Sequence, residues 1–353
     1  MKIRIPSIIC LAAFLLFLPL KAFSALPIGP EQPKFGPGGS SYPHADFVKK
    51  SYGYFEERFY IFEPAMPTPA SAPVAVFLHG WFAANPDYYI GWIEHLCKRG
   101  WIVIFPCYQG TGSHASVYTL NTIRSIKEAF KVLYSSSPIA PDRDRVSVIG
   151  HEAGAIIGAN VAASSRYFKI PVPKAVMVLM PLGGLVQGGY LGMEMYDLSA
   201  IREGTLLMVV VGEEDLAQSE NIAREIFYSA DNVRTTDKTY ITLLSDVRGT
   251  PALFADRFAP FAPKENIYER EIENRRFEFI HMFKHKGTAR PLKCRGIDAM
   301  DWLGTFRLFD ALADTAFSGG DRSQVFGNTE NQRFMGYWSN GAPVKGFYTT
   351  DRP

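Results

Sequence analysis

The chain has 353 residues, of which 47% are hydrophobic, 14% aromatic and 20% charged. This composition allows a sizeable core and excludes low-complexity disorder, collagen-like repeats and a disulfide-rich mini-fold. The formal net charge is only +2. Because a basic surface is what attracts phosphate backbones, nothing here favours nucleic acid as a partner.

The first 24 residues have the pattern of a secretory signal peptide. Lys2 and Arg4 precede an apolar run over residues 8–20, and small residues form a cleavage site before Ala25. The run of about 13 residues is shorter than the roughly 20 that span a bilayer. We therefore predict cleavage, an extracytoplasmic location (periplasmic or secreted) and no stable transmembrane anchor in the mature chain. An uncleaved anchor is the alternative.

Three cysteines remain after cleavage, so at least one thiol is free or paired between chains. Cys97 ends a predicted helix and Cys107 ends the strand that follows. These two thiols are expected to lie about 20 Å apart, too far for a disulfide. If any bridge forms, Cys107–Cys294 is the better pairing.

Residues 25–53 begin with a Pro- and Gly-rich stretch and are expected to form an extended arm. Beyond it, predicted strands alternate with predicted helices. The strands are expected over residues 54–62, 74–78, 101–105, 145–149, 175–180, 206–211 and 239–244. The helices are expected over residues 87–99, 117–134, 155–168, 220–229, 264–276 and 298–317.

This alternation, with its short β-branched runs, predicts an α/β fold: a mostly parallel sheet with helices on both faces. We expect one domain over residues 54–317. It carries an insertion at about 264–297 and is followed by a C-terminal extension over 318–353.

The most informative segment is a predicted strand–turn–helix over residues 146–160. Gly150 and Gly154 stand two residues before and two residues after Glu152. This spacing permits a turn so tight that the central side chain projects from the carboxyl end of the strand. The pattern is that of the G-x-S-x-G nucleophile elbow, with glutamate where serine is expected.

On these residues the chain resembles the α/β-hydrolase superfamily, in its secreted esterase/lipase group with cutinase-like and chlorophyllase-like enzymes, over about residues 50–317. The resemblance implies an α/β-hydrolase fold. It also implies an oxyanion hole at the turn that contains Gly80 and Trp81, completed by the backbone N–H of Ala153. The family's G-x-x-D motif places the triad acid at Asp215.

Two departures from the family pattern decide the functional prediction. Glu152 stands at the nucleophile position, and Val247 or Arg248 stands at the base position; the nearest later candidate, Arg257, is also an arginine. An arginine, with a pKa above about 12, cannot take the proton of a hydroxyl nucleophile. We therefore predict that ester hydrolysis is lost.

Both substitutions have one common explanation. Glu152 lies beside a helix N-terminus, where N–H groups favour a carboxylate, and one of its oxygens could occupy the oxyanion hole. We hypothesise that Glu152, Arg248 and Asp215 form a structural ion network in place of Ser–His–Asp, since a buried carboxylate needs a partner.

An active hydrolase with an atypical site is the alternative. Glu152 would act as nucleophile or general base on an ester-like apolar substrate, as the aspartate of haloalkane dehalogenases attacks its substrate. An ester intermediate on Glu152 would still need a base-activated water. A displaced Cys107–His114 pair is a weaker alternative, because no acid obviously serves it.

The remaining predictions concern the rim of a ligand pocket, cofactors and metal ions. Phe82, Tyr108 and His151 are expected around the rim of a pocket for a small apolar or ester-like ligand. No cofactor is predicted. His281 and His285 are spaced i, i+4 but lack the glutamate of a metalloprotease helix, so no metal is predicted either.

Overall fold

The computed structural model describes residues 25–110, 113–183, 185–186, 189–190, 192–264 and 296–353. The predicted signal peptide, the predicted helix over 264–276, the pair His281 and His285, and Cys294 therefore lie wholly or almost wholly outside the described residues.

A nine-stranded sheet forms the centre of the molecule, in the order β1-β2-β4-β3-β5-β6-β9-β10-β11. The strands from β4 to β10 are parallel, whereas β1, β2 and β11 run antiparallel to their neighbours. The strands are β1 (Asp46–Tyr52), β2 (Phe59–Ala65), β3 (Ser71–Leu78), β4 (Ile102–Pro106), β5 (Ala140–His151), β6 (Ala175–Leu179), β9 (Leu206–Gly212), β10 (Lys238–Leu243) and β11 (Tyr348–Thr350). A separate small hairpin pairs β7 (Leu185–Val186) with β8 (Gly189–Tyr190).

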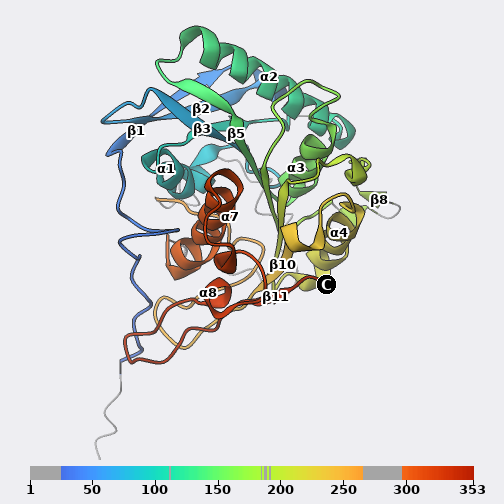
Figure 1. The fold of residues 1–353 in the computed structure, drawn as a ribbon. Coiled ribbons are helices and arrows are strands. Elements are labelled where there is room, and N and C mark those ends of the chain that lie inside the picture. The colour runs from blue at the N-terminus through green and yellow to red at the C-terminus, as the bar shows by residue number, and fades with distance from the viewer. Residues whose placement is uncertain (1–24, 111–112, 184, 187–188, 191, 265–295) are drawn as a thin grey trace, which may run out of the picture.

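Helices cover both faces of this sheet, as the alternating pattern predicts (Figure 1). They are α1 (Ile90–Lys98), α2 (Tyr118–Ser136), α3 (Ala153–Ser164), α4 (Leu216–Ser229), α7 (Phe306–Ser318) and the short α8 (Glu330–Arg333). A π-helical stretch over Met300–Thr305 leads into α7. Single 3-10 turns occur at Phe55–Glu57, Pro86–Tyr89, Ala115–Val117, Leu198–Ala200, Thr235–Asp237 and Arg322–Gln324.

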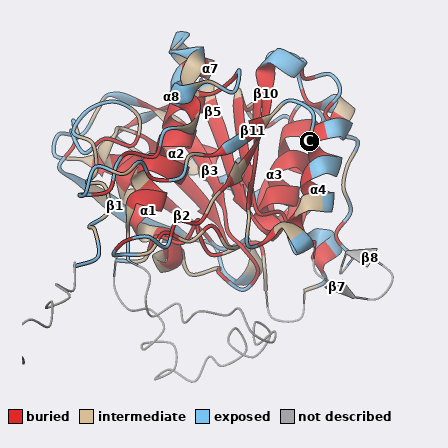
Figure 2. Cartoon of the chain, turned by 90° about the horizontal axis from the view of Figure 1, so that it is seen from below, coloured by how far each residue is buried: buried red, intermediate tan, exposed pale blue. Residues whose placement is uncertain are grey.

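The core therefore has two layers, one on each face. Helices α1 and α7 pack on one face, where the ring of Trp92 stacks on that of Phe306 at 5.4 Å. Helices α2, α3 and α4 pack on the other. Every residue of β4, β6 and β9 is buried, as expected for parallel strands covered on both sides (Figure 2).

The N-terminal hairpin differs from the prediction. The prediction of a strand over residues 54–62 is wrong for the first half of that segment. There Phe55–Glu57 forms a 3-10 turn between β1 and β2. Strand β1 instead lies in the segment expected to be an extended arm. Five of its seven residues are exposed, among them Lys49 and Ser51, so it lacks the alternating pattern that identifies a half-buried strand.

The arm and the C-terminal extension both contact the loop after β10. The Gly29 N–H donates to the Thr250 carbonyl at 3.1 Å, and the Ser339 N–H donates to the Ile28 carbonyl at 2.9 Å. The extension also adds β11 to the edge of the sheet. These segments thus fix the loop in which the family carries its catalytic base.

The strand order, the antiparallel β2 and the helices on both faces together make this the α/β-hydrolase fold. Within the described residues, no helix has the length and apolar character needed to cross a bilayer. Cys97 and Cys107 are both buried free thiols, so the prediction that they do not pair is confirmed.

Candidate active site

The turn between β5 and α3 has the backbone of an elbow. Glu152, its central residue, has φ 49° and ψ −112°. Such a conformation is strained for a residue with a side chain, and strain of this kind collects at functional sites. The Glu152 N–H donates to the Leu179 carbonyl at 3.0 Å and so holds the turn against the neighbouring strand β6.

The glycines around Glu152 are required by close approach. A Cβ at Gly150 would lie 2.1 Å from the Gly154 carbonyl oxygen, and one at Gly154 would lie 2.3 Å from the Leu78 carbonyl oxygen. A Cβ at Gly80 would lie 2.5 Å from Glu152 Oε2. The backbone contacts at Gly150 and Gly154 therefore require glycine, whereas the contact at Gly80 is with the end of the Glu152 side chain.

The Glu152 carboxyl lies against the oxyanion turn. The Trp81 backbone N–H donates to Oε2 at 3.0 Å. Oε1 is buried and has no hydrogen-bond partner in the part of the chain that the structure describes. The backbone N–H predicted for the oxyanion hole is thus already bonded to the side chain of the elbow residue.

Burial sets the protonation state of this carboxyl. It raises the pKa of Glu152 to about 8, because the charge of Arg257 and the Trp81 N–H only partly offset the loss of solvation and Asp215 adds to the rise. Glu152 is therefore mostly a neutral acid at pH 7. Among the described residues, no lysine or arginine forms an ion pair with it.

Two imidazoles lie close to the elbow, and no hydrogen bond joins either of them to Glu152 among the described residues. His151 Nε2 lies 2.7 Å from the Arg257 carbonyl oxygen and therefore carries the proton. Its Nδ1 accepts from the Tyr89 hydroxyl at 2.8 Å, and that hydroxyl accepts the Gly80 N–H at 2.8 Å. Burial lowers the pKa of His151 to about 3. This ring is neutral, and both of its nitrogens are bonded to groups other than the Glu152 carboxyl.

His79 is similarly enclosed. Its ring stacks on that of Tyr108 at 4.1 Å, and Nδ1 donates to the Gly80 carbonyl at 2.7 Å. Burial lowers its pKa to about 4. Its Nε2 is buried and has no hydrogen-bond partner in the part of the chain that the structure describes.

Asp215, the predicted triad acid, lies at the carboxyl end of β9. It is 3% exposed, and Arg257 donates to its Oδ1 from Nε at 3.2 Å and from Nη2 at 3.1 Å. Burial nevertheless raises the pKa of Asp215 above its ordinary value, against the opposing effect of Arg257. The side chain that faces the acid, where the family has histidine, is thus an arginine.

The predicted network of Glu152, Arg248 and Asp215 is wrong in two respects. Arg248 is exposed, and its Nη1 donates to the Pro343 carbonyl at 3.2 Å. Arg257 pairs with Asp215 instead, but it does not pair with Glu152.

A short excursion of the chain after β10 explains the error. Asp246 and Leu253 form an antiparallel bridge, so the segment between them turns outward and returns. The Glu214 N–H then donates to the Ala255 carbonyl at 3.1 Å, which places the residues after Leu253 beside the end of β9. Counting residues from the end of β10 does not reveal this excursion.

The expected rim residues lie at different depths. Phe82 is 39% exposed and has a positive φ of 59°. Tyr108 and His151 are fully buried, so their assignment to the rim is wrong. Tyr108 is drawn inward because its hydroxyl donates to the His79 carbonyl. The Ala153 N–H stands at the start of α3 but does not bond to the Glu152 carboxyl.

The remaining alternatives gain no support from their geometry. The Cys107 thiol donates to the Ala84 carbonyl at 3.3 Å, and burial raises its pKa to about 12. His114 Nδ1 contacts the Ser116 hydroxyl at 2.9 Å and not the thiol. Within the described residues, no group of three or more His, Cys, Asp or Glu side chains could hold a metal ion.

Comparisons with known proteins concern the fold. No protein-family model and no curated protein sequence matches the chain. An inhibited Esterase B from Lactobacillus rhamnosis aligns at 15% identity over 57% of this chain and 76% of its own, with a TM-score of 0.42. A fungal esterase from Rhizomucor miehei aligns at 13% identity over 69% and 85% of the two chains, with a TM-score of 0.45. The fold assignment rests on the strand order and on the elbow described above.

Proposed function

We propose that this chain is an extracytoplasmic α/β-hydrolase-fold protein of esterase lineage that does not hydrolyse esters and instead binds a small apolar or ester-like ligand. One observation carries the proposal. The Trp81 N–H, which an ester hydrolase would use for the tetrahedral oxyanion, donates to the elbow side chain itself. In this view Glu152 replaces the serine of the family's elbow.

The missing base supports the same conclusion. Acyl transfer from a serine needs an imidazole that takes its proton and is oriented by a carboxylate. Here Arg257 faces Asp215, and the imidazole of His151 is held by a tyrosine and a backbone carbonyl. The apolar surroundings of the elbow, which include Trp81, suit a ligand with little charge.

The location is part of the proposal and rests on the sequence. The basic start, the short apolar run and the small residues before Ala25 favour export and cleavage.

A second candidate function is favoured by the protonation state of Glu152. A carboxyl whose pKa is about 8 exchanges its proton near neutral pH, as a general acid or base should. In that case the chain would be an atypical hydrolase in which Glu152 itself transfers the proton or attacks the substrate.

An ester assay distinguishes the two candidates. We expect the mature chain to show no turnover of p-nitrophenyl butyrate or octanoate above the buffer rate, and the E152Q variant to behave identically. Turnover by the native chain that E152Q abolishes would establish the second candidate and reject the first. Stabilisation of the native chain by ethyl butyrate in thermal unfolding would report the expected binding.

A further inference from the structure

Three segments that are far apart in the sequence meet at the end of the molecule where the described chain begins. We call them the terminal loop cluster, and they are residues 25–30, 247–251 and 333–345. The Thr250 N–H donates to the Pro27 carbonyl at 2.8 Å, and the Ile28 N–H donates to the Ser339 hydroxyl at 2.9 Å. Figure 1 shows the blue arm beside loops of the orange and red parts of the chain at this end. The arm, the loop after β10 and the C-terminal extension therefore share one surface.

The terminal loop cluster is enriched in exposed apolar side chains. Its three segments hold only 24 residues, yet they contain five of the sixteen large apolar residues that are exposed in the described chain. These five, each between 47% and 66% exposed, are Leu26, Ile28, Val247, Phe334 and Tyr337. The rings of Phe334 and Tyr337 contact each other edge to face, with their centroids 5.4 Å apart. Single exposed apolar residues are ordinary, but a group of them at one place indicates a partner.

The charged residues of the cluster all have the same sign. Its segments contain Arg248, Arg333 and Lys345 and no aspartate or glutamate. Arg248 and Lys345 are exposed, and Arg333 is partly covered. Of the two acids directly next to the segments in sequence, Asp246 is buried and Glu31 is exposed. Because cations outnumber acids on this surface, a partner that covers it is expected to carry negative charge.

The place of the cluster in the chain favours a lipid bilayer as this partner. Its first segment directly follows residues 1–24, where Lys2, Arg4 and the apolar run over 8–20 have the pattern that brings a chain to a membrane. A second copy of the chain is less suited, because two clusters facing each other would bring like charges together. A bilayer with anionic headgroups removes the apolar side chains from water and attracts the cations at the same time.

We propose that the terminal loop cluster binds reversibly to the surface of a lipid bilayer that contains anionic lipid. Leu26, Ile28 and Tyr337 would enter the boundary between headgroups and acyl chains, where an aromatic ring with a polar end is well placed. Arg248 and Lys345 would contact the lipid phosphates. This contact uses none of the residues of the elbow or of the oxyanion turn, so it is independent of the proposed ligand site.

Sedimentation of the mature chain, residues 25–353, with extruded lipid vesicles tests the proposal. Phosphatidylcholine vesicles that contain about 30% phosphatidylglycerol should bind the chain at least about 5-fold more tightly than vesicles of phosphatidylcholine alone. Raising the NaCl concentration from about 50 mM to about 500 mM should remove most of this difference, because salt screens the attraction between cations and headgroups.

Two double variants test the apolar side chains independently. I28S/Y337S and L26S/V247S each remove two exposed apolar side chains from different segments of the cluster. Each should weaken binding to the anionic vesicles at least about 10-fold, since the lost side chains no longer leave water on binding. Y134S/Y167S is the matched control, because these two tyrosines are 54% and 82% exposed but lie outside the cluster. It should bind the vesicles as the native chain does.

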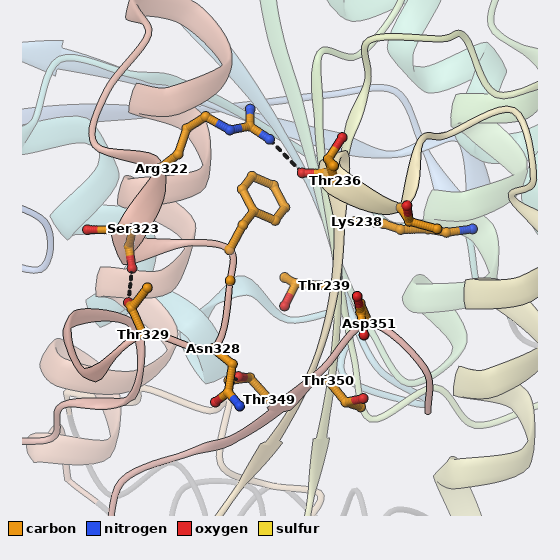
Figure 3. Close-up of a pocket in the computed structure, with 13 residues that line it drawn as sticks. Thr236, Lys238, Thr239, Arg322, Ser323, Asn328, Thr329, Thr349, Thr350 and Asp351 are labelled. Atoms are coloured by element: carbon orange, nitrogen blue, oxygen red, sulfur yellow. Dashed lines mark hydrogen bonds between the residues drawn. The ribbon is translucent and has the colours of Figure 1, made fainter.

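A single substitution tests the charge. R248Q should weaken binding to the anionic vesicles about 5-fold, the loss expected for one basic residue near the bilayer surface. R322Q is the matched control, because Arg322 is also exposed and also donates to a backbone carbonyl, that of Thr236. It lies outside the cluster, at the wall of a cavity of about 580 Å³ between the start of β10 and the C-terminal tail (Figure 3). R322Q should leave binding unchanged.

Thermal unfolding of each variant verifies that it is folded. Three results in the vesicle assay would each overturn the proposal: no binding to the anionic vesicles, binding that both double variants leave intact, or equal losses in the variants and their controls. Sedimentation velocity without lipid adds a fourth. A dimer that I28S/Y337S dissociates would show that a second copy of the chain covers the cluster, and would overturn the proposal as well.

Discussion

Two buried carboxyl groups in this molecule, Glu152 at the elbow and Asp310 on α7, have opposite protonation states. Asp310 Oδ2 accepts from the Gly38 N–H at 2.7 Å, lies 2.9 Å from His95 Nε2, and accepts from Arg99 Nε at 3.2 Å. Burial alone would raise the pKa of Asp310, but these partners outweigh it and the pKa is lowered. Glu152 accepts a single N–H, and burial raises its pKa to about 8.

The difference shows that the donors around a buried carboxyl, and not its depth, decide whether it is charged. The charged Asp310 links α1 and α7 to the N-terminal arm through Gly38, so it has a structural role. The neutral Glu152 is linked to one backbone amide, whereas Oδ2 of Asp310 has three partners; the second oxygen of each carboxyl is unbonded within the described residues. If this account is right, removing the ionisable group should have opposite effects at the two positions.

The largest effect is expected for E152Q at alkaline pH. The folded-state pKa of about 8 lies above the ordinary value of 4.5, so between these values the folded chain holds a proton that the unfolded chain releases. The native chain therefore loses stability as the pH rises from 4.5 to about 8, whereas E152Q does not titrate. The free energy of unfolding of E152Q minus that of the native chain should grow from near zero at pH 4 to several kcal/mol, at most about 5, at pH 9.

Urea unfolding of both chains across this pH range measures the difference in their free energies of unfolding. The control is E220Q, which removes a glutamate whose side chain is 44% exposed and should give a small, constant difference. If the stability difference between E152Q and the native chain did not change with pH, Glu152 would be charged in the folded chain.

D310N should change stability in the opposite direction and destabilise the folded chain. It removes a buried charge from its ion pair with Arg99 and its contact with His95, and such losses cost about 3 kcal/mol or more. D314N is the matched control, because the Asp314 side chain is 52% exposed and lies 3.6 Å from the same arginine. Its loss should stay below about 1 kcal/mol in urea unfolding at pH 7. Equal losses in the two variants would contradict the role assigned to Asp310.

The smallest expected effect is a gain of activity. In E152S/R257H the elbow gains a hydroxyl and Asp215 gains an imidazole, the arrangement that a catalytic triad needs. We expect hydrolysis of p-nitrophenyl butyrate about 100-fold above that of E152S alone, the lower end of what a general base contributes. E152S/R248H should remain at the level of E152S. Recovery in the R248H variant, and not in the R257H variant, would show that the base position is assigned wrongly.

The fold and the elbow could be predicted because their causes are local in sequence. Buried β-branched runs identify the parallel strands, and the glycine at 150 is imposed by a backbone contact with Gly154, four residues away. Asp215 follows β9 directly. In each case a short stretch of sequence contains the feature and its physical reason.

The partner of Asp215 could not be predicted in the same way. Arg257, not Arg248, reaches it because the chain makes an excursion closed by the bridge between Asp246 and Leu253. Asp246 itself is held by Trp338, whose Nε1 donates to Oδ2 at 3.1 Å from the C-terminal extension. A loop fixed by residues more than 90 positions away cannot be placed by its distance from a strand end.

The protonation state of Glu152 tests the central claim most directly. A ¹³C NMR titration of the side-chain carboxyl carbons in the glutamate-labelled mature chain, with E152Q used to assign the resonance, measures its pKa. We expect a pKa near 8, so that the carboxyl is neutral when it accepts the Trp81 N–H. A value near 4.5 or below would show a charged carboxylate with a cationic partner, and would contradict the account.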